Sequence, residues 1–201
     1  MKVAIMYDFD KTLCTKDMQE YSFIPSVGLS ASDFWEKCGK LSKKEKMDKI
    51  LSYLYLMITE SNKNDKPINR DSFKGCGKDI EFYPGVLTWF KRINEYGKSL
   101  GIEVEHYIIS SGLKEIIEGS KIAKEFKEIY ACEFYYDVNG IARWPKLVVN
   151  YTTKTQFLYR INKGVLDISN DDDLNKSIDK DDRSIPFRNI SIKITFIKQI
   201  I

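Results

Sequence analysis

The chain has 201 residues, of which 43% are hydrophobic, a composition typical of one compact globular domain or of one domain that carries a smaller insert. Its formal net charge is +3, and because the lysines are spread among acidic residues, the sequence predicts no nucleic-acid partner. No apolar run is long enough to cross a bilayer, and Asp8 and Asp10 interrupt the first one, so we expect neither a signal peptide nor a membrane partner and place the protein in the cytoplasm.

The first predicted element is residues 2–7, a short apolar run that stops at Asp8. Such a run predicts a buried parallel strand rather than a helix. A second run, residues 106–109, stops at a polar turn, Ser110-Ser111-Gly112, which precedes helical spacing at 113–117. A strand, a polar turn and a helix are thus expected twice, which predicts an α/β protein with a mainly parallel sheet.

Two helices are expected between these strands, at residues 31–39 and 43–61, because apolar residues recur there at threes and fours. Residues 62–69 are polar and predict a loop. Pro84-Gly85 then starts a helix that leads through residues 86–100 into the second strand.

We interpret the segment between the strands as a helical cap, residues 14–83, inserted into a core made of residues 1–13 and 84–201. The expected core has three layers and a Rossmann-like, mainly parallel sheet. A cap inserted after the first strand covers the strand ends and can exclude water from a site there.

Beyond the second strand, residues 130–136 and 141–144 flank an Asp137-Val138-Asn139-Gly140 turn, which predicts a β-hairpin. A helix is expected to open at Thr152-Thr153-Lys154, with a threonine as N-cap, and to stop at Gly164. Residues 170–188 are acidic and polar and predict a loop.

The residues most suggestive of chemistry are Asp8 and Asp10, directly after the first strand. The carboxyl ends of strands are where open α/β sheets bind ligands. Two neighbouring carboxylates repel each other unless a cation or a shared proton intervenes, and magnesium prefers oxygen ligands of this kind. A carboxylate freed for attack can form an aspartyl-phosphate.

The string Asp8-Phe9-Asp10-Lys11-Thr12-Leu13 resembles the first motif of the haloacid dehalogenase-like (HAD-like) hydrolases. Tyr107-Ile108-Ile109-Ser110 is similar to the second motif of that family, a hydrophobic strand that ends in Ser or Thr. Lys154 matches the third, a lysine that opens a helix. The resemblance implies a magnesium-dependent phosphatase whose partner is a small phosphorylated substrate.

The resemblance also implies roles for the residues that carry it. Asp8 would attack phosphorus, and Asp10 would protonate the leaving oxygen and later activate water. Ser110 would donate to the transferring phosphoryl group, and Lys154 would neutralise charge at Asp8.

Further positions are implied as substrate contacts: Thr12, Ser111 and Gly112. Two alternatives stay open, because Ser111 could take the role of Ser110, and Lys146 and Lys163 compete with Lys154. Magnesium would be held by Asp8 and by the main-chain carbonyl of Asp10.

The sequence departs from the family at the fourth motif, a further strand followed by metal-binding acids. One interpretation makes residues 165–169 that strand and lets Asp171, Asp172 or Asp173 complete the metal site. The other, which we favour, is that the motif is lost and residues 190–201, rich in Ile and Lys, stand in its place. The sequence thus predicts a phosphatase acting through an aspartyl-phosphate, or a truncated, impaired relative that keeps the fold and weak phosphate binding.

Overall fold

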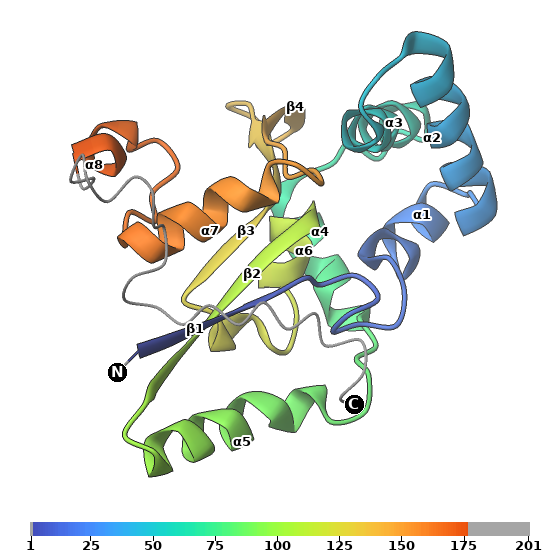
Figure 1. The fold of residues 1–201 in the computed structure, drawn as a ribbon. Coiled ribbons are helices and arrows are strands. Elements are labelled where there is room, and N and C mark those ends of the chain that lie inside the picture. Colours follow the sequence, from blue (N-terminus) through green and yellow to red (C-terminus); the bar gives the residue numbers. More distant parts are fainter. Residues whose placement is uncertain (1, 177–201) are drawn as a thin grey trace.

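The structure is a computed structural model that describes residues 2–176. Within that range, a four-stranded sheet carries helices on both faces (Figure 1). The strands are β1 (Lys2–Tyr7), β2 (Glu103–Leu113), β3 (Glu128–Tyr136) and β4 (Ala142–Leu147). The helices are α1 (Phe23–Ser26), α2 (Ala31–Glu45), α3 (Lys49–Lys63), α4 (Arg70–Cys76), α5 (Val86–Ser99), α6 (Lys114–Glu118), α7 (Lys154–Lys163) and α8 (Asp171–Lys176), with short 3-10 helices η1 (Met18–Glu20), η2 (Gly77–Asp79) and η3 (Ala123–Glu125). Among the described helices, none combines the length and the apolar character needed to cross a membrane.

The sheet has the strand order β1-β2-β3-β4. The pairs β1 with β2 and β2 with β3 are parallel, and β4 pairs antiparallel with β3. This confirms the predicted α/β class, the mainly parallel sheet and the hairpin. Tyr7 pairs with Ile108, so Asp8 leaves the sheet next to the part of β2 that leads into Ser110. Within residues 2–176, β1 pairs with no strand other than β2.

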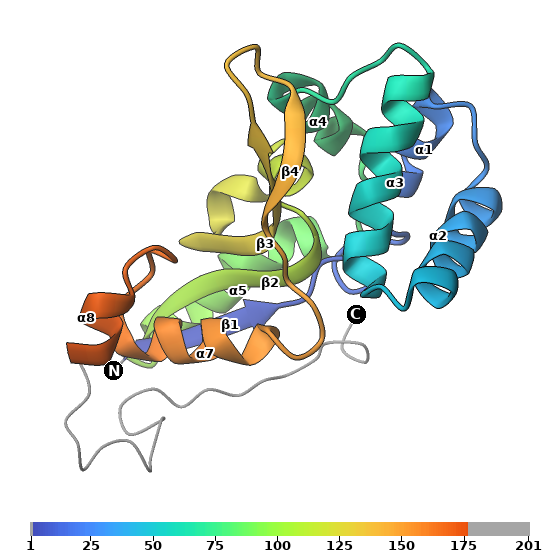
Figure 2. The ribbon, with the colours of Figure 1, turned by 90° about the horizontal axis from the view of Figure 1, so that it is seen from above.

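Helices α5 and α7 cover opposite faces of the sheet, which makes the three layers (Figures 1 and 2). Helix α5 buries Val86 and Phe90, and its Gly97 leaves room for β2, because a Cβ there would lie 2.6 Å from the side chain of Val104. On the other face, Phe157 of α7 stacks on Tyr130 with ring centroids 4.6 Å apart. These contacts fix both helices against the sheet.

A buried polar chain joins β1, β2 and α5 around the single histidine. Trp89 Nε1 donates to the hydroxyl of Tyr7 at 2.8 Å, and that hydroxyl lies 2.9 Å from His106 Nδ1. His106 Nε2 lies 2.9 Å from Asn94 Oδ1, an acceptor, so the ring proton belongs on Nε2 and the Tyr7 hydroxyl donates to Nδ1. The histidine is 3% exposed, and burial lowers its pKa from 6.5 to about 4. It is therefore neutral in the folded protein.

This histidine should make the protein less stable in mild acid. Because its pKa is about 6.5 unfolded and about 4 folded, the unfolded chain takes up the proton first, and stability falls as the pH falls through that window. We expect His106 to lower the free energy of unfolding by about 2 kcal/mol between pH 7 and pH 5. Urea unfolding at both pH values, with His106→Gln as control, isolates this group. An equal pH dependence in both proteins would contradict the prediction.

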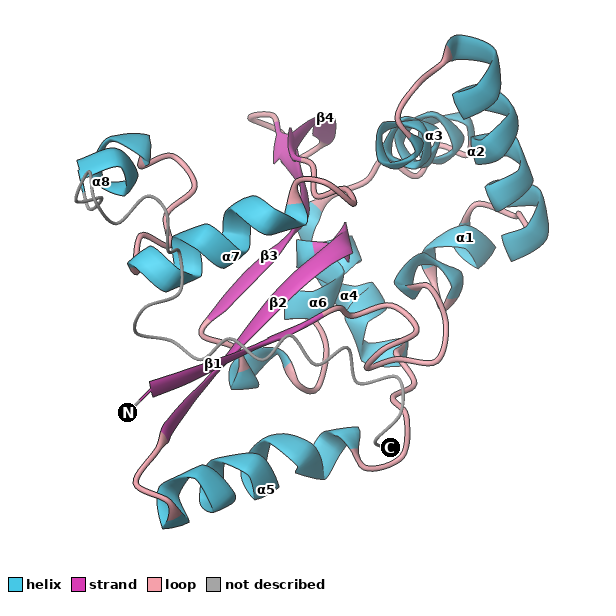
Figure 3. Cartoon of the chain, viewed as in Figure 1, coloured by secondary structure: helices cyan, strands magenta, loops and turns pink. Residues whose placement is uncertain are grey.

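The segment between β1 and α5 holds α1 to α4 and lies beyond the carboxyl ends of β1 and β2 (Figure 3). The chain leaves and returns side by side, through an antiparallel bridge between Cys14 and Phe82. The break between the two long helices was predicted near residues 40–42 and lies later. Lys46 ends α2 with φ 51°, and the Asp48 side chain caps α3 by accepting from the backbone N–H groups of its first turn. A left-handed residue followed by an aspartate N-cap explains the shift.

Helix α4 packs directly on α6, the helix that follows β2. A Cβ at Gly119 would lie 1.8 Å from the carbonyl oxygen of Lys74, and one at Gly77 would lie 2.2 Å from that of Ile116. The two backbones therefore approach as closely as only glycine allows. The cap bounds, residues 14–83, stay a prediction, as does the core of residues 1–13 and 84–201.

The C-terminal part differs from the prediction where the structure describes it. Residues 165–169 form no strand, and the loop expected at 170–188 begins instead with α8. The side chain of Asn170 accepts from the N–H of Asp173, and three acids fill the first turn, an arrangement that stabilises a helix N-terminus. The expected tail, residues 190–201, lies outside the described residues.

Candidate active site

Asp8 sits at the start of a tightly closed loop after β1. The carbonyl oxygen of Phe9 accepts from the backbone N–H groups of Thr12, Leu13 and Cys14 at 2.9 to 3.3 Å, which folds the chain back on itself. The N–H of Phe9 donates to Asp8 Oδ1 at 2.9 Å. One carboxylate oxygen of Asp8 is therefore held by its own loop, while Oδ2 faces a different partner.

That partner is Lys154, the first residue of α7. Its Nζ lies 2.9 Å from Asp8 Oδ2, and the side chains are 24% and 30% exposed. A turn built by Asn150 positions the helix, because its Oδ1 accepts from the N–H groups of Thr152 and Thr153. The N-cap residue is Thr153, one of the two predicted threonines, although its side chain accepts no hydrogen bond from the helix, and the predicted stop at Gly164 is confirmed. The structure brings together the two residues that the sequence placed in one site.

Asp10 points into the interior from the same loop. Its Oδ1 accepts from the N–H of Met18 at 2.9 Å, and the thiol of Cys14 lies 3.8 Å away. Burial and then the neighbouring Asp17 carboxylate raise the pKa of Asp10 to about 8, and the Met18 contact opposes that rise. The Oδ2 of Asp17 lies 2.5 Å from the Nζ of Lys11. Lys11 has a left-handed backbone conformation, with a φ of 53°.

The prediction of a polar turn at residues 110–112 is wrong, because β2 continues as an irregular strand through Leu113. The Oγ of Ser110 accepts from the N–H of Gly112 at 3.0 Å, which holds this stretch extended. A Cβ at Gly112 would lie 2.1 Å from Met18 Cε and 2.9 Å from Asp10 Oδ2, so a side chain at this position would displace Met18 or the Asp10 carboxyl.

The two candidate serines differ in their surroundings. Ser110 is fully buried, whereas Ser111 lines both cavities of the site. The carbonyl oxygen of Ser111 accepts from the hydroxyl of Tyr53 on α3 at 2.6 Å. Thr12 is 8% exposed. The roles of Ser110 and Ser111, like the substrate contacts of Thr12 and Gly112, stay predictions.

Two adjoining cavities surround these residues. The first is about 360 Å³ and is lined by Asp10, Asp17, Gln19, Trp35, Cys38, Gly39, Lys49, Ile50, Tyr53 and Ser111. The second is about 850 Å³ and is lined by Met6, Tyr7, Asp8, Asp48, Lys49, Ile50, Ile109, Ser111, Asn150, Tyr151, Thr152, Lys154, Thr155 and Leu158. Asp10 thus borders a smaller chamber beneath α2 and α3, and Asp8 with Lys154 borders the larger one.

Three residues of the inserted helices that sequence reasoning missed line these cavities: Gln19, Lys49 and Tyr53. Lys49 and Tyr53 lie in a helix whose apolar spacing predicts only packing. Nothing in their spacing distinguishes them from surface or core residues, so only the folded geometry identifies them.

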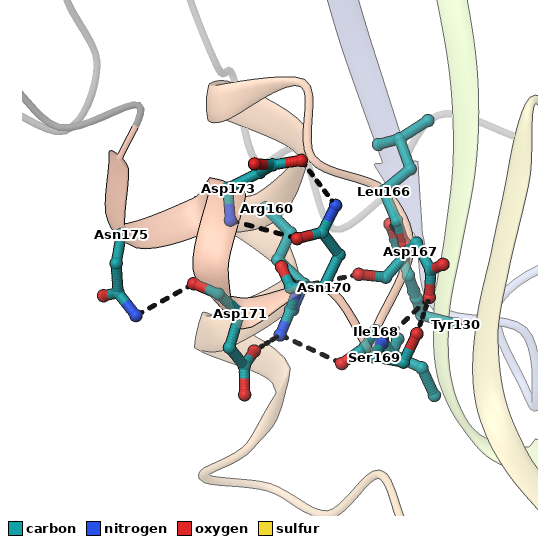
Figure 4. Close-up of polar contacts among 10 residues, drawn as sticks. All are labelled: Tyr130, Arg160, Leu166, Asp167, Ile168, Ser169, Asn170, Asp171, Asp173 and Asn175. Carbon is teal, nitrogen blue, oxygen red and sulfur yellow. Dashed lines mark hydrogen bonds and ion pairs between the residues drawn. The ribbon is translucent and has the colours of Figure 1, made fainter.

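The assignment of Asp171 to the metal site needs correction. Asp171 begins α8, which lies past the C-terminal end of α7, while Lys154 and Asp8 meet at the other end of that helix (Figures 1 and 2). The guanidinium of Arg160 binds the Asp171 carboxylate and also donates to the carbonyl oxygen of Asp167 (Figure 4). A ten-residue helix is about 15 Å long, so this acidic turn is held away from Asp8.

Asp172 and Asp173 share the position of Asp171 on α8, and all three are exposed. Over residues 2–176, no group of three His, Cys, Asp or Glu side chains could hold a metal ion. Asp8 and the main-chain oxygen of Asp10 nevertheless offer hard oxygen donors. Magnesium prefers such donors and binds to one or two carboxylates together with substrate phosphate and water. The donor set fits a magnesium ion that keeps several waters.

Known proteins resemble this chain in sequence and in fold. No family model matches the chain. An uncharacterized protein from Borreliella burgdorferi is 30% identical over 94% of this chain and 72% of its own length.

Among solved structures, a HAD family hydrolase from Salmonella enterica serovar Typhi superposes with a TM-score of 0.59 at 19% identity, over 81% of this chain. The chain spans 51% of the length of that hydrolase. A substrate-bound phosphoserine phosphatase gives a TM-score of 0.58 at 16% identity over 81% of this chain and 71% of that one. A phosphoserine phosphohydrolase-like protein from Francisella tularensis gives 0.51 at 19% identity over 89% of this chain and 74% of that one. At these identities the likeness shows the fold.

Proposed function

Because the chain belongs to one family with the uncharacterized Borreliella burgdorferi protein and has the haloacid dehalogenase-like fold, we propose that it is a phosphatase that hydrolyses small phosphomonoesters through an aspartyl-phosphate. The observation that carries the proposal is the 2.9 Å contact between Asp8 and Lys154 at the end of β1. A carboxylate held beside an ammonium group, at the strand ends of an α/β sheet, suits attack on an anionic phosphoryl group.

In the first step, Asp8 Oδ2 forms a bond to phosphorus while the bond from phosphorus to the ester oxygen breaks. Lys154 neutralises negative charge on Asp8 and on the phosphoryl oxygens as they meet. Asp10, a carboxyl whose pKa is raised by burial, gives a proton to the departing oxygen.

In the second step, Asp10 takes a proton from water as that water attacks phosphorus, which releases phosphate and restores Asp8. Asp8 and the Asp10 carbonyl would hold magnesium, which supplies positive charge to the phosphoryl oxygens when bound. Ser110, or Ser111 from the cavity wall, would donate a hydrogen bond to the phosphoryl group.

The experiment that tests the proposal is hydrolysis of an aryl phosphate by the full chain, with magnesium and with a chelator. We expect turnover that a chelator abolishes and added magnesium restores. A rival proposal, a phosphate-binding relative without turnover, is favoured by the lack of a third acidic ligand among the described residues. Phosphate binding by the folded chain without any turnover would support that rival and contradict the phosphatase.

Lys49 should contribute to substrate capture. It is exposed at the start of α3, lines both cavities, and forms no ion pair with the described residues. Since it offers a second positive charge near the mouth of the site, we expect Lys49→Met to raise KM for aryl phosphate roughly threefold to tenfold, with kcat changed less than twofold. Added salt should shrink the difference.

The matched control for Lys49 is Lys43→Met, which removes another exposed lysine, from α2. This variant should keep the wild-type KM. An effect of Lys49→Met on kcat alone would contradict a role in capture.

A further inference from the structure

The two cavities of the site divide the reacting residues between them. Asp8 lines the larger cavity but not the smaller, whereas Asp10 lines the smaller cavity but not the larger. In phosphoryl transfer the attacking and leaving oxygens lie roughly in line, on opposite sides of phosphorus. An ester that Asp8 attacks and Asp10 protonates therefore places its alcohol in the smaller cavity, beneath α2 and α3.

Much of the wall of the smaller cavity is apolar. From α2 and α3 it is lined by Trp35, Cys38, Ile50 and Tyr53. The indole nitrogen of Trp35 donates to Glu20 Oε1 at 2.7 Å, so the polar atom of that ring is already paired. Burial raises the pKa of the Cys38 thiol to about 12, so this side chain stays neutral and acts as a small apolar group.

Polar side chains of the same wall pair within the protein. The Tyr53 hydroxyl donates to a backbone carbonyl oxygen of β2 at 2.6 Å, and Asp17 Oδ2 lies 2.5 Å from Lys11 Nζ. The carboxamide oxygen of Gln19 has almost no accessible surface. A positive charge lines the cavity at Lys49, an exposed residue at the start of α3. A charged or strongly polar alcohol would thus lose its hydration in this cavity and gain few partners.

Ring contacts hold the aromatic part of the wall in place. The Trp35 ring packs edge-on against Phe34 and Tyr53, with centroids 5.1 and 6.0 Å apart. The cavity has a volume of about 360 Å³, near the lower end of the range of roughly 300 to 1,000 Å³ that is typical of ligand pockets. It is therefore a preformed, compact space that suits a single ring or a short alkyl chain.

We infer that the smaller cavity selects phosphomonoesters whose leaving group is a compact apolar alcohol, such as an aromatic or short alkyl one. This inference rests on the proposed phosphatase function and adds to it the chemical class of the alcohol that is released. Trp35 and Ile50 supply the selectivity, because apolar groups that leave water for their surfaces strengthen binding, whereas a charged group must shed its water there.

The test compares four alkyl esters whose alcohols differ in polarity: benzyl, propyl, 2,3-dihydroxypropyl and 2-amino-2-carboxyethyl phosphate. In the wild type we expect kcat/KM for benzyl phosphate to exceed that for propyl phosphate by roughly tenfold, and propyl phosphate to exceed each polar ester by at least about tenfold. Equal kcat/KM for all four esters, or the highest value for either polar ester, would overturn the inference.

Variants of the wall identify the residues responsible. Ile50→Asn, which makes part of the wall polar, should lower the ratio of kcat/KM between benzyl and 2,3-dihydroxypropyl phosphate at least about fivefold. Trp35→Leu keeps an apolar wall without the ring, so it should lower the ratio between benzyl and propyl phosphate while propyl phosphate stays preferred over the polar esters. Unchanged ratios in both variants would overturn the assignment of selectivity to this cavity.

The matched control is Ile58→Asn, the same change at another half-buried isoleucine of α3, which lines neither cavity. It should keep the ratios of the wild type. A loss of selectivity in Ile58→Asn equal to that in Ile50→Asn would also contradict the inference, since the effect would then not depend on the cavity wall.

A binding measurement separates this inference from the proposed function. Calorimetry on Asp8→Asn reports the affinity for the four esters without turnover. If the wild type hydrolyses neither aryl phosphate nor these esters, the phosphatase proposal fails. Tighter binding of benzyl phosphate than of the polar esters, reduced when Ile50→Asn is added, would still support an apolar binding cavity, and equal binding, or no binding, of all four would overturn it.

Discussion

Asp8→Asn is expected to reduce kcat for aryl phosphate hydrolysis by at least about a thousandfold, because an amide oxygen cannot form the acyl-phosphate bond that the proposed first step requires. The fold should be retained. Asp8 is 30% exposed, and its ion pair with Lys154 contributes at most about 1 kcal/mol to stability at such a position. Steady-state kinetics and thermal unfolding of the same preparation measure both effects.

The matched control is Asp71→Asn, the same change at an exposed aspartate of α4. It should keep wild-type kcat. The covalent step has its own readout: acid-quenched wild type in single turnover should carry one phosphoryl group on the peptide that contains Asp8, and Asp8→Asn should carry none. Turnover by Asp8→Asn near the wild-type rate would exclude Asp8 as the nucleophile.

The sequence predicts the part of the site that local patterns encode. An apolar run that stops at an Asp-x-Asp pair specifies a buried strand with carboxylates at its end, and Asp8 and Asp10 lie there. Lys154 opens a helix in the sequence, and the structure brings its ammonium to Asp8. Short-range turn chemistry, such as the side chain of Asn150, carries enough information to position that helix.

Long-range packing decided the features that the sequence left out. The stretch from Ser110 to Gly112 has turn-forming composition, yet it continues β2, because β2 pairs with the distant strand β3 as far as Leu113 and Cys132. Asp171 looked available for a metal because its sequence neighbours are acidic. The Asp171 carboxylate pairs instead with the guanidinium of Arg160 on α7, and only the folded structure reveals that ion pair.

Lys154→Met should lower kcat/KM for aryl phosphate by about a hundredfold to a thousandfold, comparable to the loss of a donor that stabilises charge in a transition state. Its Nζ, 2.9 Å from Asp8 Oδ2, is placed to stabilise the phosphoryl oxygens as they approach a carboxylate of the same charge. Lys154→Arg should recover part of the activity, because arginine restores the positive charge but spreads it over a planar guanidinium group.

Lys163→Met, at the far end of the same helix, is the control and should stay near the wild type, since Lys163 lies over the ring of Tyr159. Loss of activity in Lys163→Met with none in Lys154→Met would move the role to the other end of α7 and remove Lys154 from the mechanism.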